Sequence, residues 1–163
     1  MAEKPNITIR AATDADQEKK NNALVEHWGS TRIVTRGRIH ATDQLPCLIA
    51  EVDGEMVGFL TYEIYGQECE LISINAFESG KGIGTALLKR LREIAEENNC
   101  RGIWLITTND NVEAMRFYQI KGFYFVAVHR DAVMAARRLK PEIPVIGNHG
   151  IPIRDEIELV MPL

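Results

Sequence analysis

Residues 79–85 of the chain read SGKGIGT and lie between an apolar segment of alternating pattern and a segment of helical periodicity. The glycines of this stretch have no Cβ atom, so a ligand can approach the backbone closely there. Main-chain N–H groups in the first turn of a helix have no acceptor within it, and they lie at the positive end of its dipole. The stretch therefore predicts an anion site formed by Gly80, Lys81, Gly82, Ile83, Gly84 and Thr85. A glycine-rich connection that binds no ligand is the alternative.

Two common phosphate-binding motifs do not fit this stretch. A Walker loop needs Gly-Lys-Ser/Thr at the end of its glycine frame, and the chain lacks that combination. A dinucleotide loop needs a glycine where Leu87 stands and an acidic residue where Thr107 and Thr108 end the next apolar run. Neither a P-loop nor a dinucleotide-binding motif is expected.

The segments around the loop predict a mixed α/β (α+β) fold in a single domain covering residues 1–163. The alternating or short apolar runs predict strands at residues 7–11, 47–52, 56–62, 68–76, 103–107, 123–128 and 157–161. The helical patterns cover residues 13–28, 83–99, 109–121 and 131–139. Residues 31–44 are polar without a clear period, and we interpret them as a loop or short helix over the sheet. A mixed sheet of six or seven strands flanked by helices follows, with the strand at 103–107 parallel to the one at 68–76.

Composition excludes several classes of protein. Apolar residues make up 45% and charged residues 26%, which is typical of a globular domain. The net charge of −4 argues against a dedicated binder of nucleic acid or anionic membranes. No apolar run is long enough for a membrane span, and the N-terminus has no signal-peptide pattern. We expect Cys47, Cys69 and Cys100 to be buried free thiols in a reducing cytoplasm.

Two motifs together resemble a known family. Residues 79–88 are similar to the acyl-CoA pyrophosphate loop of the GNAT superfamily of N-acyltransferases, Arg/Gln-x-x-Gly-x-Gly/Ala, with Gly82 and Gly84 at the glycine positions. Ser79 stands where Arg or Gln is usual, which removes one long polar side chain beside the ligand. Residues 109–123 are similar to the family's Asn-x-x-Ala-x-x-x-Tyr…Gly-Phe segment, with Asn111 and Tyr118 at the polar positions. The resemblance is firm over residues 48–128.

The resemblance implies how acetyl-CoA is held. The pantetheine arm would lie between splayed strands, at residues 71–76 and 103–107, and pair with main chain near Ile74 and Ala76. A main-chain N–H near Ile74 would act as the oxyanion donor. Asn111 would reach the cofactor through its side-chain amide, unless that amide satisfies local backbone instead.

The transfer chemistry needs an acid and a base. Tyr118 is the candidate general acid, since a phenol with a pKa near 10 matches the basicity of the CoA thiolate. The alternative is a core tyrosine. Glu68 and Glu70, two residues apart and so on one face of a strand, are the candidate bases. Glu68 matches the catalytic glutamate of some histone-directed members; solvated edge charges, with water as the base, are the alternative.

Candidate substrate determinants precede the loop, and an insertion follows the second motif. The resemblance places the family's variable substrate-side elements at His27, Trp28, Arg36, Arg38 and His40. The two arginines of that set can receive a carboxylate or phosphate, and a plain solvated loop is equally consistent with them.

The histidines form no metal-ligand pattern, so no metal is expected. Residues 130–154 read as an insertion with a basic patch, which would cover the active site, contact the CoA 3′-phosphate or pair with another subunit.

The sequence thus predicts a cytoplasmic N-acetyltransferase that moves an acetyl group from acetyl-CoA to a primary amine of a small molecule by direct transfer in a ternary complex. A protein N-terminus or lysine is an alternative acceptor, and a non-catalytic acyl-CoA sensor is an alternative class. A cleft narrowed by Trp28 and residues 36–40 favours a small molecule, whereas an open acidic groove favours a peptide. No nucleic acid or membrane partner is expected, and a homodimer is among the arrangements that the sequence allows.

Overall fold

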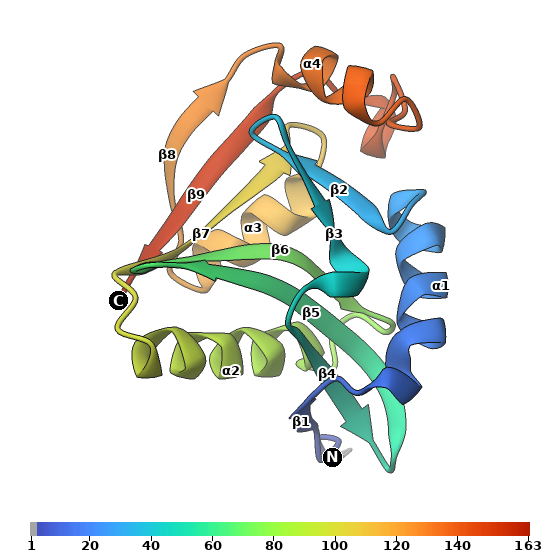
Figure 1. Ribbon diagram of the computed structural model, residues 1–163, viewed down its shortest axis with the longest axis vertical. Helices are drawn as coiled ribbons and strands as arrows, with labels where there is room; N and C mark the ends of the chain where they lie inside the picture. Colours follow the sequence, from blue (N-terminus) through green and yellow to red (C-terminus); the bar gives the residue numbers. More distant parts are fainter. Residues whose placement is uncertain (1–2) are drawn as a thin grey trace.

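A seven-stranded mixed sheet runs through the centre of the computed structural model, which describes residues 3–163 (Figure 1). In spatial order its strands are β1 (Thr8–Ala11), β4 (Cys47–Val52), β5 (Glu55–Tyr65), β6 (Glu68–Ala76), β7 (Gly102–Thr108), β9 (Glu156–Pro162) and β8 (Tyr124–His129). β6 and β7 run parallel, and the other neighbouring pairs are antiparallel. The predicted mixed sheet and its parallel crossover are confirmed.

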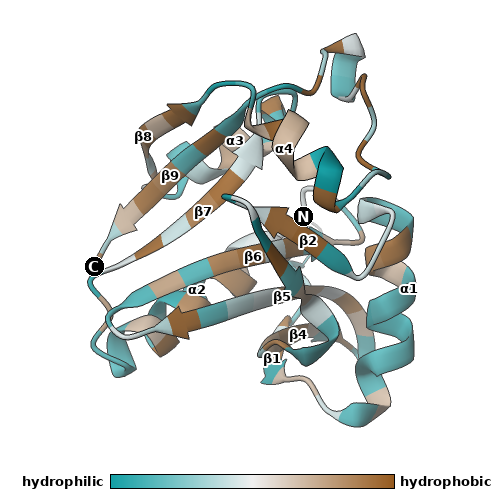
Figure 2. Ribbon diagram, turned by 45° about the horizontal axis from the view of Figure 1, so that its top comes forward, coloured by the Kyte–Doolittle hydropathy of each residue, from teal (hydrophilic) through white to brown (hydrophobic). Residues whose placement is uncertain are grey.

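Helices cover both faces of this sheet. They are α1 (Gln17–Trp28), α2 (Ile83–Glu97), α3 (Val112–Ile120) and α4 (Ala132–Leu139), with short 3-10 turns at Asp14–Asp16, Thr42–Gln44 and Asn148–Gly150. The buried stripe of α2 and the inner side of α3 pack in one core cluster with the strands, whereas α1 packs on the opposite face. Leu87 and Leu91 of α2 are fully buried, and each such burial is worth roughly 1.5–3 kcal/mol. Figure 2 shows apolar residues on β2, β7 and β9, while much of α1 is hydrophilic.

The prediction of a loop or short helix over residues 31–44 is wrong. Most of this segment forms a two-stranded hairpin of β2 (Arg32–Thr35) and β3 (Arg38–Ala41), which crosses one face of the main sheet (Figure 1). Arg36 and Gly37 form its turn with φ of 52° and 74°. Positive φ at both central residues is the requirement of the tight hairpin turn, and arginine is not a residue that signals it.

Helix α3 also begins later than predicted, at Val112 rather than at residue 109. The side chain of Asn109 accepts hydrogen bonds from the main-chain N–H groups of Arg154 and Asp155, at 2.9 and 3.0 Å. These tertiary contacts hold the approach to the helix in a non-helical conformation, so that Asn111 becomes the N-cap.

β6 and β7 separate along their length. Residues 68–70 pair with residues 102–104, and no register pair between these strands follows beyond them among residues 3–163. On the other side of β6, the register with β5 shifts between Ser73 and Leu71, which leaves Ile72 as a bulge. A bulge bends its strand and increases the local twist, so the carboxyl ends of β6 and β7 diverge. The predicted splay is present.

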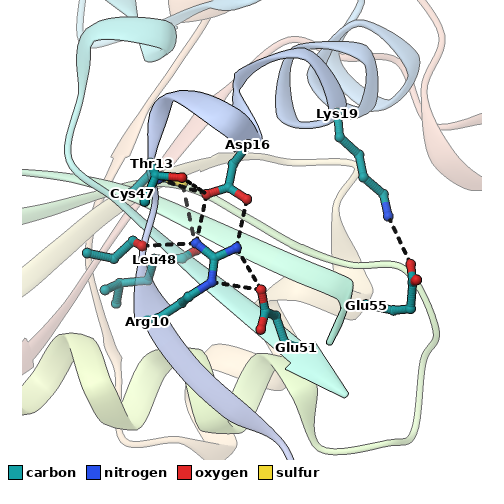
Figure 3. Close-up of polar contacts among 9 residues, drawn as sticks. Arg10, Thr13, Asp16, Lys19, Cys47, Leu48, Glu51 and Glu55 are labelled. Atoms are coloured by element: carbon teal, nitrogen blue, oxygen red, sulfur yellow. Dashed lines mark hydrogen bonds and ion pairs between the residues drawn. The ribbon is translucent and has the colours of Figure 1, made fainter. Parts of the chain in front are cut away.

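A partly buried ion pair fixes the start of α1 (Figure 3). The guanidinium of Arg10 donates hydrogen bonds to both carboxylate oxygens of Asp16 and to Glu51, each at 2.7 Å. Arg10 thereby holds the pKa of Asp16 well below its usual range. Because Arg10 is on β1 and Glu51 on β4, these bonds attach the helix to the sheet and set where its other end, Trp28, arrives.

The cysteines and the helices can be compared with the predictions made from composition. Cys47, Cys69 and Cys100 are buried and free, as predicted. Among residues 3–163, no helix combines the length and the apolar character that a membrane crossing requires.

Candidate active site

A cavity of about 870 Å³ lies where β6 and β7 separate. Its walls are residues 71–76 of β6, residues 105–108 of β7, one face of α3, the end of α1 and residues of the segment 140–153. This volume is in the range of pockets that bind small molecules and cofactors. The strands whose separation the sequence predicts therefore enclose a cavity of the size that such ligands need.

The glycine-rich loop follows the carboxyl end of β6. Gly80 and Gly82 have φ of 75° and 80°, and Gly82 is the N-cap of α2. The first helical hydrogen bond runs from the N–H of Ala86 to the carbonyl of Gly82, at 3.0 Å, so the preceding N–H groups have no acceptor within the helix. A Cβ at Gly84 would come within 3.3 Å of the Phe117 ring, so this glycine lets α2 approach α3. The geometry is that of an anion site, while its use by acetyl-CoA stays a prediction.

Tyr118 lies on α3 and lines the cavity. It is 8% exposed, and its ring packs edge-on against Phe117 and Phe123, with centroids 5.5 and 5.4 Å away. Burial raises the pKa of its hydroxyl above the ordinary value near 10 that matches the CoA thiolate, so the phenol keeps its proton at neutral pH and is a weaker acid than the sequence alone predicts. Tyr118 is thus both a core residue and a residue of the cavity wall.

Asn111, the N-cap of α3, also lines the cavity. Its amide nitrogen donates a hydrogen bond to the hydroxyl of Thr107, at 3.1 Å. The side chain is therefore oriented by β7, which leaves the predicted contact with the cofactor untested.

The two candidate bases have different environments. Glu70 is 1% exposed and accepts a hydrogen bond from the Thr35 hydroxyl, at 2.7 Å, while His40 Nε2 lies 2.7 Å from that hydroxyl. Burial raises the pKa of Glu70 to about 7. Glu68 is exposed at the start of β6, three residues before Leu71, and is not among the residues that line the cavity. The alternative of a solvated edge charge describes Glu68 and not Glu70.

Only part of the predicted substrate set reaches the cavity. His27 and Trp28 line it, and the Trp28 indole N–H donates to Asn75 Oδ1 at 3.2 Å. Arg36, Arg38 and His40 are on the hairpin and are not among the residues that line the cavity.

Both arginines have partners in the hairpin region. The Arg36 guanidinium lies 3.3 Å from Glu158 and 5.4 Å from the centre of the Trp104 ring. The Arg38 guanidinium lies 3.3 Å from Glu63 and 4.3 Å from the centre of the Tyr65 ring.

Residues 140–153, which we call the strap, form part of the cavity wall. Lys140 is 5% exposed, burial lowers its pKa, and its ammonium donates to the carbonyl of Trp28 at 2.7 Å. Asn148 donates to the Asp110 carboxylate through its main chain and its side chain, at 3.0 and 3.1 Å. Arg137 donates to strap carbonyls. Of the predicted uses of this insertion, covering the site is the one that this geometry fits. Arg137 and Lys140 donate hydrogen bonds to main-chain carbonyls within the fold and so do not contribute to a basic surface patch.

A side compartment of about 80 Å³ adjoins the cavity and shares wall residues with it. Glu156 of β9 lines this compartment and is 3% exposed. Its Oε2 accepts a hydrogen bond from the main-chain N–H of Arg36, at 3.0 Å, and burial raises its pKa. Sequence reasoning missed Glu156 because nothing in its local pattern distinguishes it from Glu158. Among residues 3–163, no three His, Cys, Asp or Glu side chains converge as a metal site would require.

Splayed parallel strands that open into a cavity, with a glycine-rich loop leading into a helix at the carboxyl end of one of them, are the arrangement expected of acyl-CoA-dependent acyltransferases. Residues 9–123 match the model of the acetyltransferase (GNAT) family. The chain belongs to this family and is an acetyl-CoA-dependent acyltransferase.

Two relatives show how similar the chain is to other proteins in sequence. The chain is 48% identical over 135 residues to the uncharacterized protein YdhI of Bacillus subtilis (strain 168), covering 82% of this chain and 84% of that protein. It is 32% identical over 84 residues to the spermine/spermidine N(1)-acetyltransferase of the same strain, covering 45% and 55%.

Two solved structures show the same fold. The IAA acetyltransferase from Bacillus cereus ATCC 14579 has a TM-score of 0.76 at 24% identity, covering 97% of this chain and 100% of that chain. A GNAT acetyltransferase from Elizabethkingia anophelis with acetyl-CoA bound has a TM-score of 0.69 at 20% identity, covering 97% and 99%.

Proposed function

We propose that the chain transfers the acetyl group of acetyl-CoA to a primary amine of a small molecule, within a ternary complex. The observation that carries this proposal is the set of elements that wall the acceptor side of the cavity. Trp28 and β2 form one wall, the strap forms another, and Lys140 joins the strap to the end of α1 by its hydrogen bond to Trp28. Beyond them the space ends in the 80 Å³ compartment. A polypeptide needs an open groove, whereas this shape accommodates a short side chain or a small amine.

The donor is held mainly by main chain in this proposal. N–H groups of residues 80–85 bind the pyrophosphate, and Lys81 adds a charge at the rim. The pantetheine arm takes the place of a missing strand beside β6 and pairs near Ile74 and Ala76, where β7 has turned away. Asn111 contacts the arm from the opposite wall.

The chemistry requires one bond to form and one to break. The amine nitrogen attacks the thioester carbonyl carbon, the N–H near Ile74 stabilises the oxyanion, and the C–S bond breaks as the amide forms. Tyr118 gives its proton to the departing CoA thiolate, a contribution of about 10²–10⁴-fold for a well-placed acid.

Glu70 receives the proton that the amine loses in this scheme. The carboxylate is not in the cavity wall, but the Thr35 hydroxyl that bonds to it lines the side compartment. A proton therefore passes through Thr35 or a water molecule to reach Glu70. A pKa of about 7 makes this carboxylate basic enough to accept it at neutral pH.

A relative with a small-molecule acceptor supports the proposal. The spermine/spermidine N(1)-acetyltransferase of B. subtilis aligns over 45% of this chain, and polyamines carry primary amino groups on a flexible aliphatic chain. Such acceptors suit a site with buried carboxylates nearby.

The test is a thiol-release assay with acetyl-CoA over alkylamines, polyamines, aminoglycosides and peptides. We expect turnover with small primary amines and none with peptides. Turnover with peptides alone would contradict the proposal in favour of a protein acetyltransferase. Thermal shift is run in parallel, since a ligand of the native state raises its stability. Stabilisation by acetyl-CoA without consumption by any acceptor would instead indicate a sensor.

A further inference from the structure

Glu156 is a buried carboxylate with few partners. It is 3% exposed, at the start of β9, where it pairs in register with Thr108 of β7 and His129 of β8. The main-chain N–H of Arg36 is bound to Oε2, and no other hydrogen bond to this carboxylate is found among residues 3–163. A carboxylate can accept about four hydrogen bonds, and burying one without compensation is costly.

No basic side chain among residues 3–163 lies within ion-pair distance of Glu156, and Arg36 and His129 offset the effect of its burial on the pKa only in part. The Arg36 guanidinium is 3.3 Å from Glu158 and lies over Trp104, and His129 Nε2 is 3.6 Å from the same oxygen of Glu158. Glu158, two residues further along β9, is thus the ion-pair partner of Arg36 and lies beside His129. Glu156 remains available to a positive group that enters from the compartment.

The compartment suits an aliphatic chain. Apart from Glu156, its walls include Val34, Thr35, Ile106, Val133 and Ala136. It shares Trp28, Thr107 and Asn111 with the main cavity, so a molecule can extend from one space into the other. Its volume of about 80 Å³ corresponds to roughly two or three water molecules at about 30 Å³ each, enough for an ammonium group and one or two methylenes.

We propose that Glu156 binds a second, charged amino group of the acceptor and so selects short aliphatic diamines, or the aminoalkyl end of a longer polyamine. This inference rests on the proposed function. The nitrogen that attacks the thioester has to be uncharged and to lie in the main cavity, so the group held by Glu156 is a different nitrogen. The compartment takes the charged amino group with one or two methylenes, and the rest of the spacer lies in the main cavity.

The experiment compares 1,3-diaminopropane with propylamine, which has the same chain length and lacks the second amino group. Steady-state kinetics are measured at saturating acetyl-CoA for the wild type, Glu156→Gln and the matched control Glu158→Gln. We expect the wild type to prefer the diamine at least tenfold in kcat/KM. Glu156→Gln should lower kcat/KM for the diamine about 10- to 100-fold, mainly through KM, because a charge-assisted hydrogen bond is lost. Propylamine should change less than about threefold, and Glu158→Gln should leave the preference in place.

Several results overturn this inference. Equal kcat/KM for the two amines in the wild type does so without any variant, and therefore also if Glu156→Gln does not fold. An unchanged preference in Glu156→Gln also overturns it, as does an equal fall in kcat for both amines, which would put Glu156 in the chemistry. The failure of the proposed function looks different: neither amine is acetylated at all. If both amines are acetylated alike, the proposed function stands and the role of Glu156 falls.

Discussion

Glu70 should make the protein less stable as the pH rises from 5 to 8. Its pKa is about 7 in the folded protein because of burial, against an ordinary value of 4.5, and the hydrogen bond from Thr35 offsets only part of this effect. Between pH 4.5 and about 7, the two pKa values, the folded chain holds a proton on Glu70 that the unfolded chain has lost. The free energy of unfolding therefore falls as the pH rises through this range. At about 1.4 kcal/mol per pKa unit, the fall amounts to about 3 kcal/mol and is complete slightly above pH 7. Glu70→Gln cannot titrate and should not show it.

Urea unfolding at pH 5, 6, 7 and 8 measures this effect for the wild type and Glu70→Gln. The control is Glu68→Gln, which removes an exposed carboxylate from the same strand and should follow the wild type. Burial lowers the pKa of His40, which adds stability as the pH rises toward 6.5, but the histidine is present in all three proteins and its contribution largely cancels in the differences. Parallel curves for the wild type and Glu70→Gln, within about 1 kcal/mol over the whole range, would refute the assigned titration.

Three further substitutions test other parts of the site. Tyr118→Phe should lower kcat about 10²-fold or more while calorimetry finds acetyl-CoA affinity nearly unchanged, and an unaltered kcat would remove Tyr118 as the acid. Gly147→Ala places a Cβ against the Asp110 carboxylate, so it should cost about 1–3 kcal/mol, lower the Tm by several degrees and raise the acceptor KM; an unchanged Tm would contradict the docking of the strap. Gly82→Ala meets no atom within 4 Å but has a φ of +80°, so it should cost about 1–2 kcal/mol and weaken acetyl-CoA binding. Gly66→Ala has a φ of +55° and equally open space, so it should cost similar stability and leave acetyl-CoA affinity unchanged; equal affinity losses in both variants would count against the loop.

Local patterns predicted the parts of the fold that local forces determine. The buried stripe of α2 and the strand alternation before it depend on residues a few positions apart, so their periodicity is visible in the sequence. The hairpin of β2 and β3 was missed because its turn uses Arg36 at positive φ, a conformation that its neighbours and packing impose rather than its own preference.

Long-range packing determined what the sequence did not predict about the site. Glu156 and Glu158 are two residues apart on one strand, yet one lines a compartment and the other holds Arg36 and His129. Their difference arises from the hairpin and α4, more than 100 and about 20 residues away along the chain respectively. The same holds for Glu68 and Glu70, which share a face of β6 and differ in exposure because the hairpin covers only the second. No local pattern contains that information.

Charge is distributed along this site in a way that a net charge of −4 conceals. At the loop, uncharged main-chain amides and Lys81 make up the predicted anion site. Beneath the hairpin, the carboxylates of Glu70 and Glu156 are buried, and they suit a cationic acceptor. The transfer itself changes neither the phosphates of CoA nor a remote ammonium, so these charges bind and orient the reactants without driving the reaction. In the proposed mechanism the reacting atoms between them therefore depend on neutral donors, the phenol of Tyr118 and a main-chain N–H of β6, whose effect does not require a net charge at the centre of the cavity.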